Sequence, residues 1–266
     1  MATLGNIIKG VGQGIFDRTL GRLTGAGIPM DSRIVHVKAK WSGRSDKKDW
    51  RVRLQIPVDA DSVYNSILAN NELLNPLQDA RGIFWPLTPA VVIQHSANYN
   101  PLSQTHSNYP FQAYQNSQVD SMNIIGEFPV QNSDDAKHWV ATVNFLRTVT
   151  KMYFGKEQPL KGNPPPILHL SGYGDHMFNN VPVIVNTFNV ELRPGIDYIS
   201  TKQSEVYRSN VQDFDLDSAD QTWAPTLSNI SVLVTPVYSR ESIKDFSLSE
   251  FARGQLNGKE TGIGFI

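Results

Sequence analysis

Three groups of residues in this chain of 266 residues have types and spacings that could do chemistry. The first is the glycine-rich run Gly10-Val11-Gly12-Gln13-Gly14, which looks like part of a nucleotide-binding turn. Such a turn follows a strand and precedes an acidic residue that binds the ribose, and neither is found at the required position. We therefore interpret these glycines as small residues that let a helix lie close against a neighbour.

The second group is the acidic run 213–220, in which Asp213 and Asp215 begin a spacing that suggests calcium binding. A calcium loop of the EF-hand type also needs a glycine at its sixth position and a glutamate at its twelfth. Those positions hold Ser218 and Ala224 in this chain. We interpret the run as a solvated acidic loop, which we expect to contact other proteins.

The third group consists of His169, Asp175 and His176, which surround a turn at residues 172–174 and could hold a metal or serve as acid and base. Histidine and aspartate beside such a turn more often form the turn itself. The chain also lacks the Gly-x-Ser-x-Gly, His-Glu-x-x-His and Walker A patterns. We therefore predict that the protein is not an enzyme and has no catalytic residue, metal site or cofactor.

Composition narrows the class of protein further. The chain has no cysteine, which excludes disulfides, thiolate zinc sites and cysteine nucleophiles. Its net charge of −1 gives no electrostatic footprint for nucleic-acid binding and little self-repulsion against association. With 40% apolar and 18% charged residues, the composition suits a folded protein that buries polar surface against neighbours.

Residues 1–30 predict a helical docking arm. No apolar run in the chain reaches the ~18 residues of a membrane-spanning helix, so we expect no membrane insertion. The N-terminus also lacks the layout of a secretory signal, so we expect the mature protein to be the whole chain. Glycines weaken the helix, which therefore needs a surface to lie on. Its candidate contact residues are Leu4, Ile7, Ile8, Val11, Ile15 and Phe16.

Alternation of apolar and polar residues predicts a hairpin formed by residues 33–41 and 50–56. One face of this hairpin is apolar and the other is basic, and the basic residues are Lys38, Lys40, Arg51 and Arg53. This basic face fits either ordinary solubility or a contact with an acidic neighbour. A place in a DNA channel is disfavoured, because fixed cations would hold the phosphates instead of letting them slide.

One long helix is predicted at residues 133–154. Asn132 or Ser133 can cap its start, Lys151 lies in its last turn, and Gly155 follows it. Its apolar residues form a single stripe along about 30 Å of helix, as in a helix that is buried on one side.

The remaining elements are mostly strands. Strands are predicted at 90–95 and 122–128, joined by a partly extended connection rich in Asn, Tyr and Pro. Residues 166–170 and 181–192 predict a second hairpin, and residues 227–238 predict a last strand in which Pro236 marks an edge or a bulge. Further predictions are a short helix and a loop at 61–82 with a break at 73–76, a long polar loop at 200–222, and a flexible tail at 254–266.

Together these elements predict an α+β fold of mainly antiparallel strands at residues 31–253, between the docking arm and the tail. Two motifs within it are specific. Residues 107–114 read Ser-Asn-Tyr-Pro-Phe-Gln-Ala-Tyr, and residues 145–155 read Phe-Leu-Arg-Thr-Val-Thr-Lys-Met-Tyr-Phe-Gly. With further matches in the segments 182–188, 223–226 and 246–251, the chain resembles the baseplate tail-tube initiator and tube-junction proteins of contractile-tailed bacteriophages.

The resemblance implies a tail-tube-like β-barrel or sandwich with one long flanking helix. It further implies a structural virion protein that forms a ring of about six copies between the baseplate hub and the tail tube. Such a ring would template assembly of the tail tube and form part of the channel for DNA ejection. The protein would assemble in the host cytoplasm and reside in the virion, at the tail baseplate and the proximal tail tube.

The partners implied by the resemblance are further copies of the chain, the tail tube protein, and a second tube-junction ring or the baseplate hub. Baseplate wedge or sheath-initiating proteins are also implied, and the tape measure protein and DNA would pass through the channel. We expect contacts with these partners at the docking arm, at the basic face, and at His176, Asp213, Asp215 and Phe265.

Two other classes of protein remain open. A monomeric carbohydrate- or ligand-binding β-domain could use the aromatic side chains of Trp41, Trp50, Trp85 and Tyr99, and would bind its ligand saturably. A zinc or calcium hydrolase built on residues 169–176 or 213–220 would lose activity or stability on chelation.

Overall fold

The computed structural model describes residues 50–69, 71–154, 160–202, 222–258 and 262–266. The chain divides into two compact units, Met1–Gly43 and Arg44–Ile266. The predicted docking arm, the strand at 33–41 with Lys38 and Lys40, and the acidic run 213–220 lie outside the described residues. All elements of the described fold belong to the second unit.

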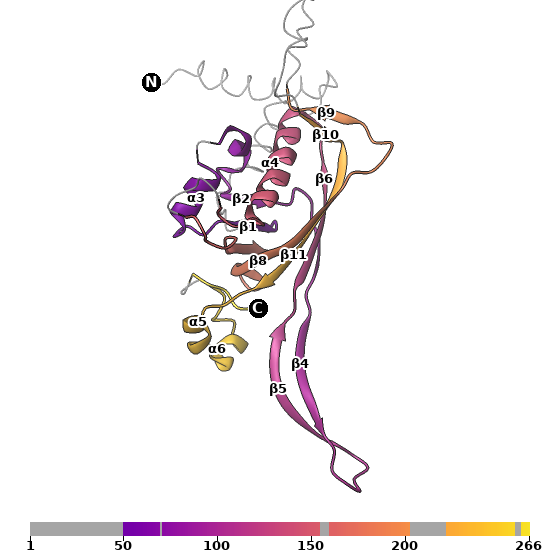
Figure 1. Cartoon of the computed structure of the whole chain (residues 1–266), viewed down its shortest axis with the longest axis vertical. Coiled ribbons are helices and arrows are strands. Elements are labelled where there is room, and N and C mark those ends of the chain that lie inside the picture. Colours follow the sequence, from indigo (N-terminus) through magenta and orange to yellow (C-terminus); the bar gives the residue numbers. More distant parts are fainter. Residues whose placement is uncertain (1–49, 70, 155–159, 203–221, 259–261) are drawn as a thin grey trace, which may run out of the picture. The chain divides into compact units, whose positions relative to one another are not determined.

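The centre of the fold is an open sheet of seven antiparallel strands in the order β2-β1-β7-β8-β11-β6-β3 (Figure 1). Two smaller sheets pair β4, His95–Leu102, with β5, Phe111–Val119, and β9, Tyr198–Ser200, with β10, Trp223–Pro225. Within the described ranges no pairing joins β2 to β3, so the sheet is not a closed barrel. The predicted α+β fold of mainly antiparallel strands is confirmed. The strands of the large sheet are β1 Arg53–Gln55, β2 Gly82–Phe84, β3 Ala90–Val92, β6 Met122–Pro129, β7 Leu168–Gly172, β8 Phe178–Glu191 and β11 Leu227–Pro236.

The long strands follow the alternation in the sequence. The predicted hairpin is confirmed, since β7 pairs with β8 around the turn that contains His176. The predicted last strand is confirmed as β11, but its place in the sheet differs from the prediction. It lies between β6 and β8 instead of at an edge, and its bulge falls between Leu233 and Val234 instead of at Pro236.

Helix α4, Ser133–Val149, packs on one face of this sheet (Figure 1). As predicted, Asn132 caps its start, and the side chain of Asn132 accepts a hydrogen bond of 2.8 Å from the backbone N–H of Asp135. The indole N–H of Trp139 donates a buried hydrogen bond of 2.6 Å to the hydroxyl of Ser228 in β11. This bond fixes the helix to the middle of the sheet.

The helix ends earlier than the predicted residue 154. The hydroxyls of Thr148 and Thr150 donate to the carbonyls of Asn144 and Leu146 at 2.9 and 3.0 Å, in competition with the backbone of the last turn. The backbone N–H of Tyr153 already bonds outside the helix, to Asn163. The basic residue of the last turn is therefore Arg147 and not Lys151.

The segment before β2 also differs from its prediction. Helix α3, Asp61–Ile67, is present as predicted, but the expected break lies inside the 3₁₀-helix η1, Glu72–Leu77. Pro76 is tolerated there, and the buried side chains of Leu74 and Leu77 hold η1 against α4. The pattern of apolar and polar residues did not predict the short strand β2, nor β9, Tyr198–Ser200, nor β10, Trp223–Pro225.

The C-terminal residues form a small ordered module with two helices, α5 (Arg240–Lys244) and α6 (Leu248–Ala252). The ring of Phe265 stacks on Tyr238 with 4.5 Å between centroids, and the Tyr238 hydroxyl accepts a hydrogen bond from the backbone N–H of Ile266. The predicted flexible tail is therefore wrong for the described residues 254–258 and 262–266, because aromatic stacking ties them to the end of β11. No helix of the described chain is long and apolar enough to cross a membrane.

Gly126 provides a test of how the core is built. Its Cα lies directly under the ring of Trp85, so that a Cβ would overlap this ring and come within 3.2 Å of Pro89. We predict that Gly126→Ala lowers the free energy of unfolding by about 1–3 kcal/mol, as overpacked core substitutions do. Urea denaturation measures the loss. Ile125→Ala, whose side chain is on the opposite, exposed face, is the control and should cost less; equal stability of Gly126→Ala and wild type would contradict this packing.

Candidate assembly surface

The histidines that the sequence groups together lie in different surroundings. His169 is half-buried in β7. His176 lies in the turn before β8 and lines a cleft of about 370 Å³ with His95 and Asp175. No group of three or more His, Cys, Asp or Glu side chains in the described ranges could hold a metal ion. The geometry thus favours the interpretation of these residues as parts of a strand and a turn.

The same cleft brings together two of the predicted interface residues, His176 and Phe265. Its other walls come from the base of β4 and from α6. Apolar side chains that remain partly exposed, such as Met177 and Phe251, line it as well. Phe265 also holds the C-terminal module together, since its ring lies 5.3 Å from that of Phe246.

The predicted basic face is not an exposed surface where the structure describes it. Arg53 has a relative exposure of only 7%, and it lies in a strand that pairs with β2 on one side and with β7 on the other. The guanidinium of Arg51 lies 4.9 Å from the centre of the Phe84 ring, in a cation–π contact. Arg53 is thus buried in the subunit instead of exposed on a basic face, and the interface through Arg51 and Arg53 stays a prediction.

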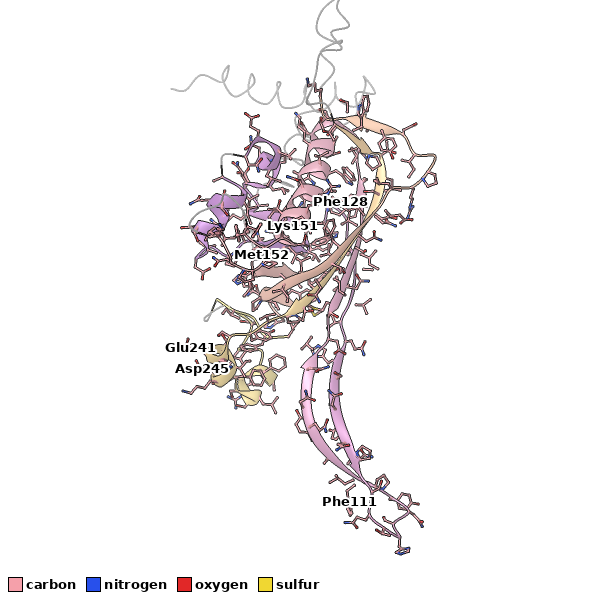
Figure 2. The ribbon with its side chains drawn as sticks, viewed as in Figure 1. Phe111, Phe128, Lys151, Met152, Glu241 and Asp245 are labelled. Carbon is pink, nitrogen blue, oxygen red and sulfur yellow. The ribbon has the colours of Figure 1, made fainter. Side chains whose placement is uncertain are left out.

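A two-stranded arm formed by β4, His95–Leu102, and β5, Phe111–Val119, is exposed along most of its length. It continues the pairing of β3 with β6, and Figure 1 shows it extending from that end of the sheet. The sequence predicted only a partly extended connection here. Figure 2 shows Phe111 close to the tip of the arm.

The surface of the arm is aromatic and uncharged. Tyr109 and Phe111 at its tip have relative exposures of 83% and 62%. The rings of Tyr99 and Tyr114 contact each other across the strands, with centroids 5.7 Å apart. Between Arg81 and Asp120 the sequence contains no Lys, Arg, Asp or Glu. Exposed strands normally carry charges that prevent pairing with other chains, so this arm has the composition of a surface that a protein partner covers.

A second uncovered surface is one face of the sheet. We call it the bare face: it comprises the outward side chains of β3, β6, β11 and the second half of β8, opposite the face that packs on α4. Its members are Ala90, Val92, Asn123, Ile125, Glu127, Thr187, Asn189, Glu191, Asn229, Ser231, Leu233 and Thr235. These side chains are half-buried or exposed, and six of the twelve are polar without charge.

Polar side chains on and beside the bare face form hydrogen bonds and an ion pair with one another. The amide of Asn186 donates a hydrogen bond of 2.8 Å to the hydroxyl of Thr235, and the amide of Asn229 donates one of 3.1 Å to the carboxylate of Glu191. Arg193, just beyond β8, forms an ion pair of 3.6 Å with the same carboxylate. The face is therefore ordered and close to neutral, with Glu127 as its other charged member.

The aromatic residues that a ligand-binding domain would need lie in separate parts of the structure. Trp85 has a relative exposure of 0% and packs in the core beside Phe128. Trp50 stacks on Tyr173, and Tyr99 belongs to the arm. Trp41 lies outside the described residues. Trp50, Trp85 and Tyr99 thus form no common platform for a sugar or another flat ligand.

A further exposed apolar segment follows α4. Met152 and Phe154 have relative exposures of 52% and 76%, and Figure 2 shows Met152 next to Lys151. They belong to the motif at residues 145–155, while Tyr109 and Phe111 belong to the motif at residues 107–114. Both motifs therefore contain exposed aromatic or apolar side chains, which suits contacts between proteins.

His169 makes the stability of the fold depend on pH. Burial lowers the pKa of His169 from its ordinary value of 6.5, and the carboxylate of Asp59 opposes this shift. The folded state therefore binds fewer protons at this site than the unfolded state, so stability falls as the pH drops through 6.5.

We predict that His169→Gln loses less stability than wild type between about pH 7.5 and about pH 5.5. Thermal unfolding at several pH values measures the difference. His106→Gln, in the exposed turn of the arm, is the matched control and should keep the wild-type dependence. Identical pH profiles for His169→Gln and wild type would contradict the assignment.

Comparison with known proteins identifies no family for this chain. A scan against models of protein families gave no match, and a search of curated proteins gave none either. The resemblance to tube-initiator and tube-junction proteins therefore stays a prediction, and the function rests on the surfaces of the chain itself.

Proposed function

We propose that this chain is a structural subunit of a ring between the baseplate hub and the tail tube of a contractile-tailed bacteriophage. In this position it templates assembly of the tail tube and forms part of the channel for DNA ejection. The observation that carries the proposal is the bare face, because a single subunit leaves one broad, ordered sheet surface uncovered by any described element.

The chemistry of the bare face suits a channel. DNA binds tightly where Lys and Arg neutralise several phosphates, and a channel through which DNA slides must avoid such contacts. Asn, Ser and Thr supply most of the polar atoms of the bare face, and its charged members are Glu127 and Glu191. Weak repulsion of phosphates is the expected result.

The tail-tube-like barrel of this proposal belongs to the assembly and not to one subunit. A barrel has no free edges, whereas the described sheet is open. Several copies arranged around an axis can close such sheets jointly, with α4 on the outside and the bare face inside. The ring would have about six copies if it matches the symmetry expected for the tail tube.

The arm supplies the contact with the next layer. An isolated two-stranded hairpin is marginally stable at best in water, and an arm without charges gains stability when a partner covers it. We assign the tail tube protein, or a second tube-junction ring or the baseplate hub, as the partner of the arm. The exposed residues Met152 and Phe154 are a second contact surface, for a neighbouring subunit or a baseplate wedge or sheath-initiating protein.

A test of the proposal introduces charge at the tip of the arm. We predict that Tyr109→Asp/Phe111→Asp leaves the fold intact, because both side chains are exposed in the subunit. Its incorporation into particles, in cells that supply the variant in place of the wild type, should fall at least about tenfold, since buried unpaired carboxylates are costly. Quantitative immunoblotting of purified particles measures the incorporation.

The matched control is Leu248→Asp, which introduces the same charge in α6 at a side chain with a relative exposure of 73%. It should enter particles as the wild type does. Circular dichroism and the melting temperature confirm that each variant is folded. Normal incorporation of the arm variant would show that the arm makes no essential contact and would count against the proposed function.

A further inference from the structure

We propose that neighbouring copies of this chain join edge to edge, with the second half of β8 in one copy paired to the β3–β4 edge of the next. This inference rests on the proposed function in one respect, since it assigns the contact that builds the ring. The inference depends on the register and direction of β8, β11, β6 and β3, and on the lack of charged side chains along the two edges before Glu191.

The first observation is that β8 is paired on both sides only in its first half. Its partner β7 begins at Leu168, which pairs with Val183, and β7 pairs with no residue of β8 beyond Val183. On the other side, β11 pairs with β8 from Val183 to Glu191. Residues 184–191 therefore have a free backbone edge within the described chain, which we call the β8 overhang.

The second observation is that the opposite end of the same four strands is also free. β3 pairs with β6 on one side only. The hydrogen bond from the N–H of Asp120 to the carbonyl of Gln94 continues this pairing into the arm. The outer side of residues 90–102 is therefore one continuous edge, the β3–β4 edge. The four strands β8, β11, β6 and β3 thus form a sub-sheet with two open sides.

The directions of the strands make these two edges compatible. Each neighbouring pair in the sub-sheet is antiparallel, so β8 and β6 run one way while β11 and β3 run the other. Placing β3 of one copy beside β8 of the next therefore continues the antiparallel order. The two surfaces differ from each other, so the contact is heterologous and repeats from copy to copy until a ring closes.

The two edges also match in charge. Neither residues 82–119 nor residues 177–190 contain a Lys, Arg, Asp or Glu. Natural sheet edges are commonly protected by such charges, which prevent pairing with another chain. Pairing the two neutral edges desolvates no ionised side chain before Glu191, at the end of the overhang. A second copy of the chain is therefore the partner that both edges fit.

Cysteine cross-linking tests this joint directly, because the wild-type chain contains no cysteine. Val92 and Thr187 lie on the bare face at opposite sides of the sub-sheet, and three strand spacings of about 14 Å in total separate them within one subunit. A disulfide cannot span that distance in one subunit. We would oxidise the full-length variant Val92→Cys/Thr187→Cys, and the same Val92→Cys combined with Asn189→Cys or Glu191→Cys to cover the register.

We predict that at least one of these three variants gives dimers, trimers and higher species on a non-reducing gel. Asn189→Cys/Ser231→Cys, at residues directly opposite each other in one subunit, should form an internal disulfide without such a ladder and reports that oxidation has worked. Val92→Cys/Lys244→Cys, with its second cysteine on α5, should give no ladder.

The outcomes separate the joint from the proposed function. Negative-stain electron microscopy can show whether rings form. If rings are seen but none of the three variants gives cross-linked oligomers, the proposed pairing of edges is wrong and the ring function remains in place. A chain that stays monomeric and gives no ladder would overturn both. Cross-linking that stops at dimers would also contradict the joint, because a heterologous contact continues beyond two copies.

A charge exchange gives a second measurement. Val92→Lys should abolish self-association, since a lysine at the β3–β4 edge meets the uncharged part of the overhang, residues 184–190. Adding Thr187→Glu should restore it, whereas adding Thr187→Lys should not. Sedimentation velocity measures the association. Equal association of all three variants would contradict the pairing of these edges.

Discussion

The fold depends on the packing of a single helix, α4, against one face of an antiparallel sheet. The buried hydrogen bond of 2.6 Å between Trp139 and Ser228 fixes this contact, and the apolar side chains of β6 and β11 fill the space around it. Removing either partner would leave a buried polar group unsatisfied, which costs about 1–3 kcal/mol. A sheet of this size has two faces, however, and one helix can cover only one of them.

The other properties of the surface follow from this asymmetry. The bare face stays solvated by means of Asn, Ser and Thr side chains, and the β8 overhang and the β3–β4 edge keep unpaired backbone groups. The arm is exposed on nearly all sides and has no charge to protect it. A monomeric protein would normally cover or charge such edges. These features together support the proposal that the chain is a subunit that associates with other copies of itself.

The sequence predicted those elements whose own periodicity is strong. Helix α4, the hairpin of β7 and β8, and strands β6 and β11 all bury one regular stripe or one alternating face, and hydrophobic patterning reports this. The arm was not recognised as a hairpin because both of its faces are polar or aromatic, so no alternation marks the strands. The predicted barrel is not seen in the subunit, whose described sheet is open, and its closure by several copies belongs to the proposal.

Other differences come from contacts between residues far apart in the sequence. The C-terminal residues are ordered because Phe265 stacks on Tyr238, a contact that glycine content and position near the end do not reveal. Arg53 is buried in a strand that pairs on both sides, whereas its alternation alone suggested a solvated basic face. For the assembly surface, the signal available in the sequence was the absence of charge from residue 82 to residue 119.

The most direct test of the central claim is the number of copies of this chain in purified particles from its source. Quantitative peptide mass spectrometry can measure this number relative to the abundant tube protein. A ring at the start of the tail tube predicts about six copies per particle, the content of one closed ring. Absence of the chain from purified particles would contradict the account.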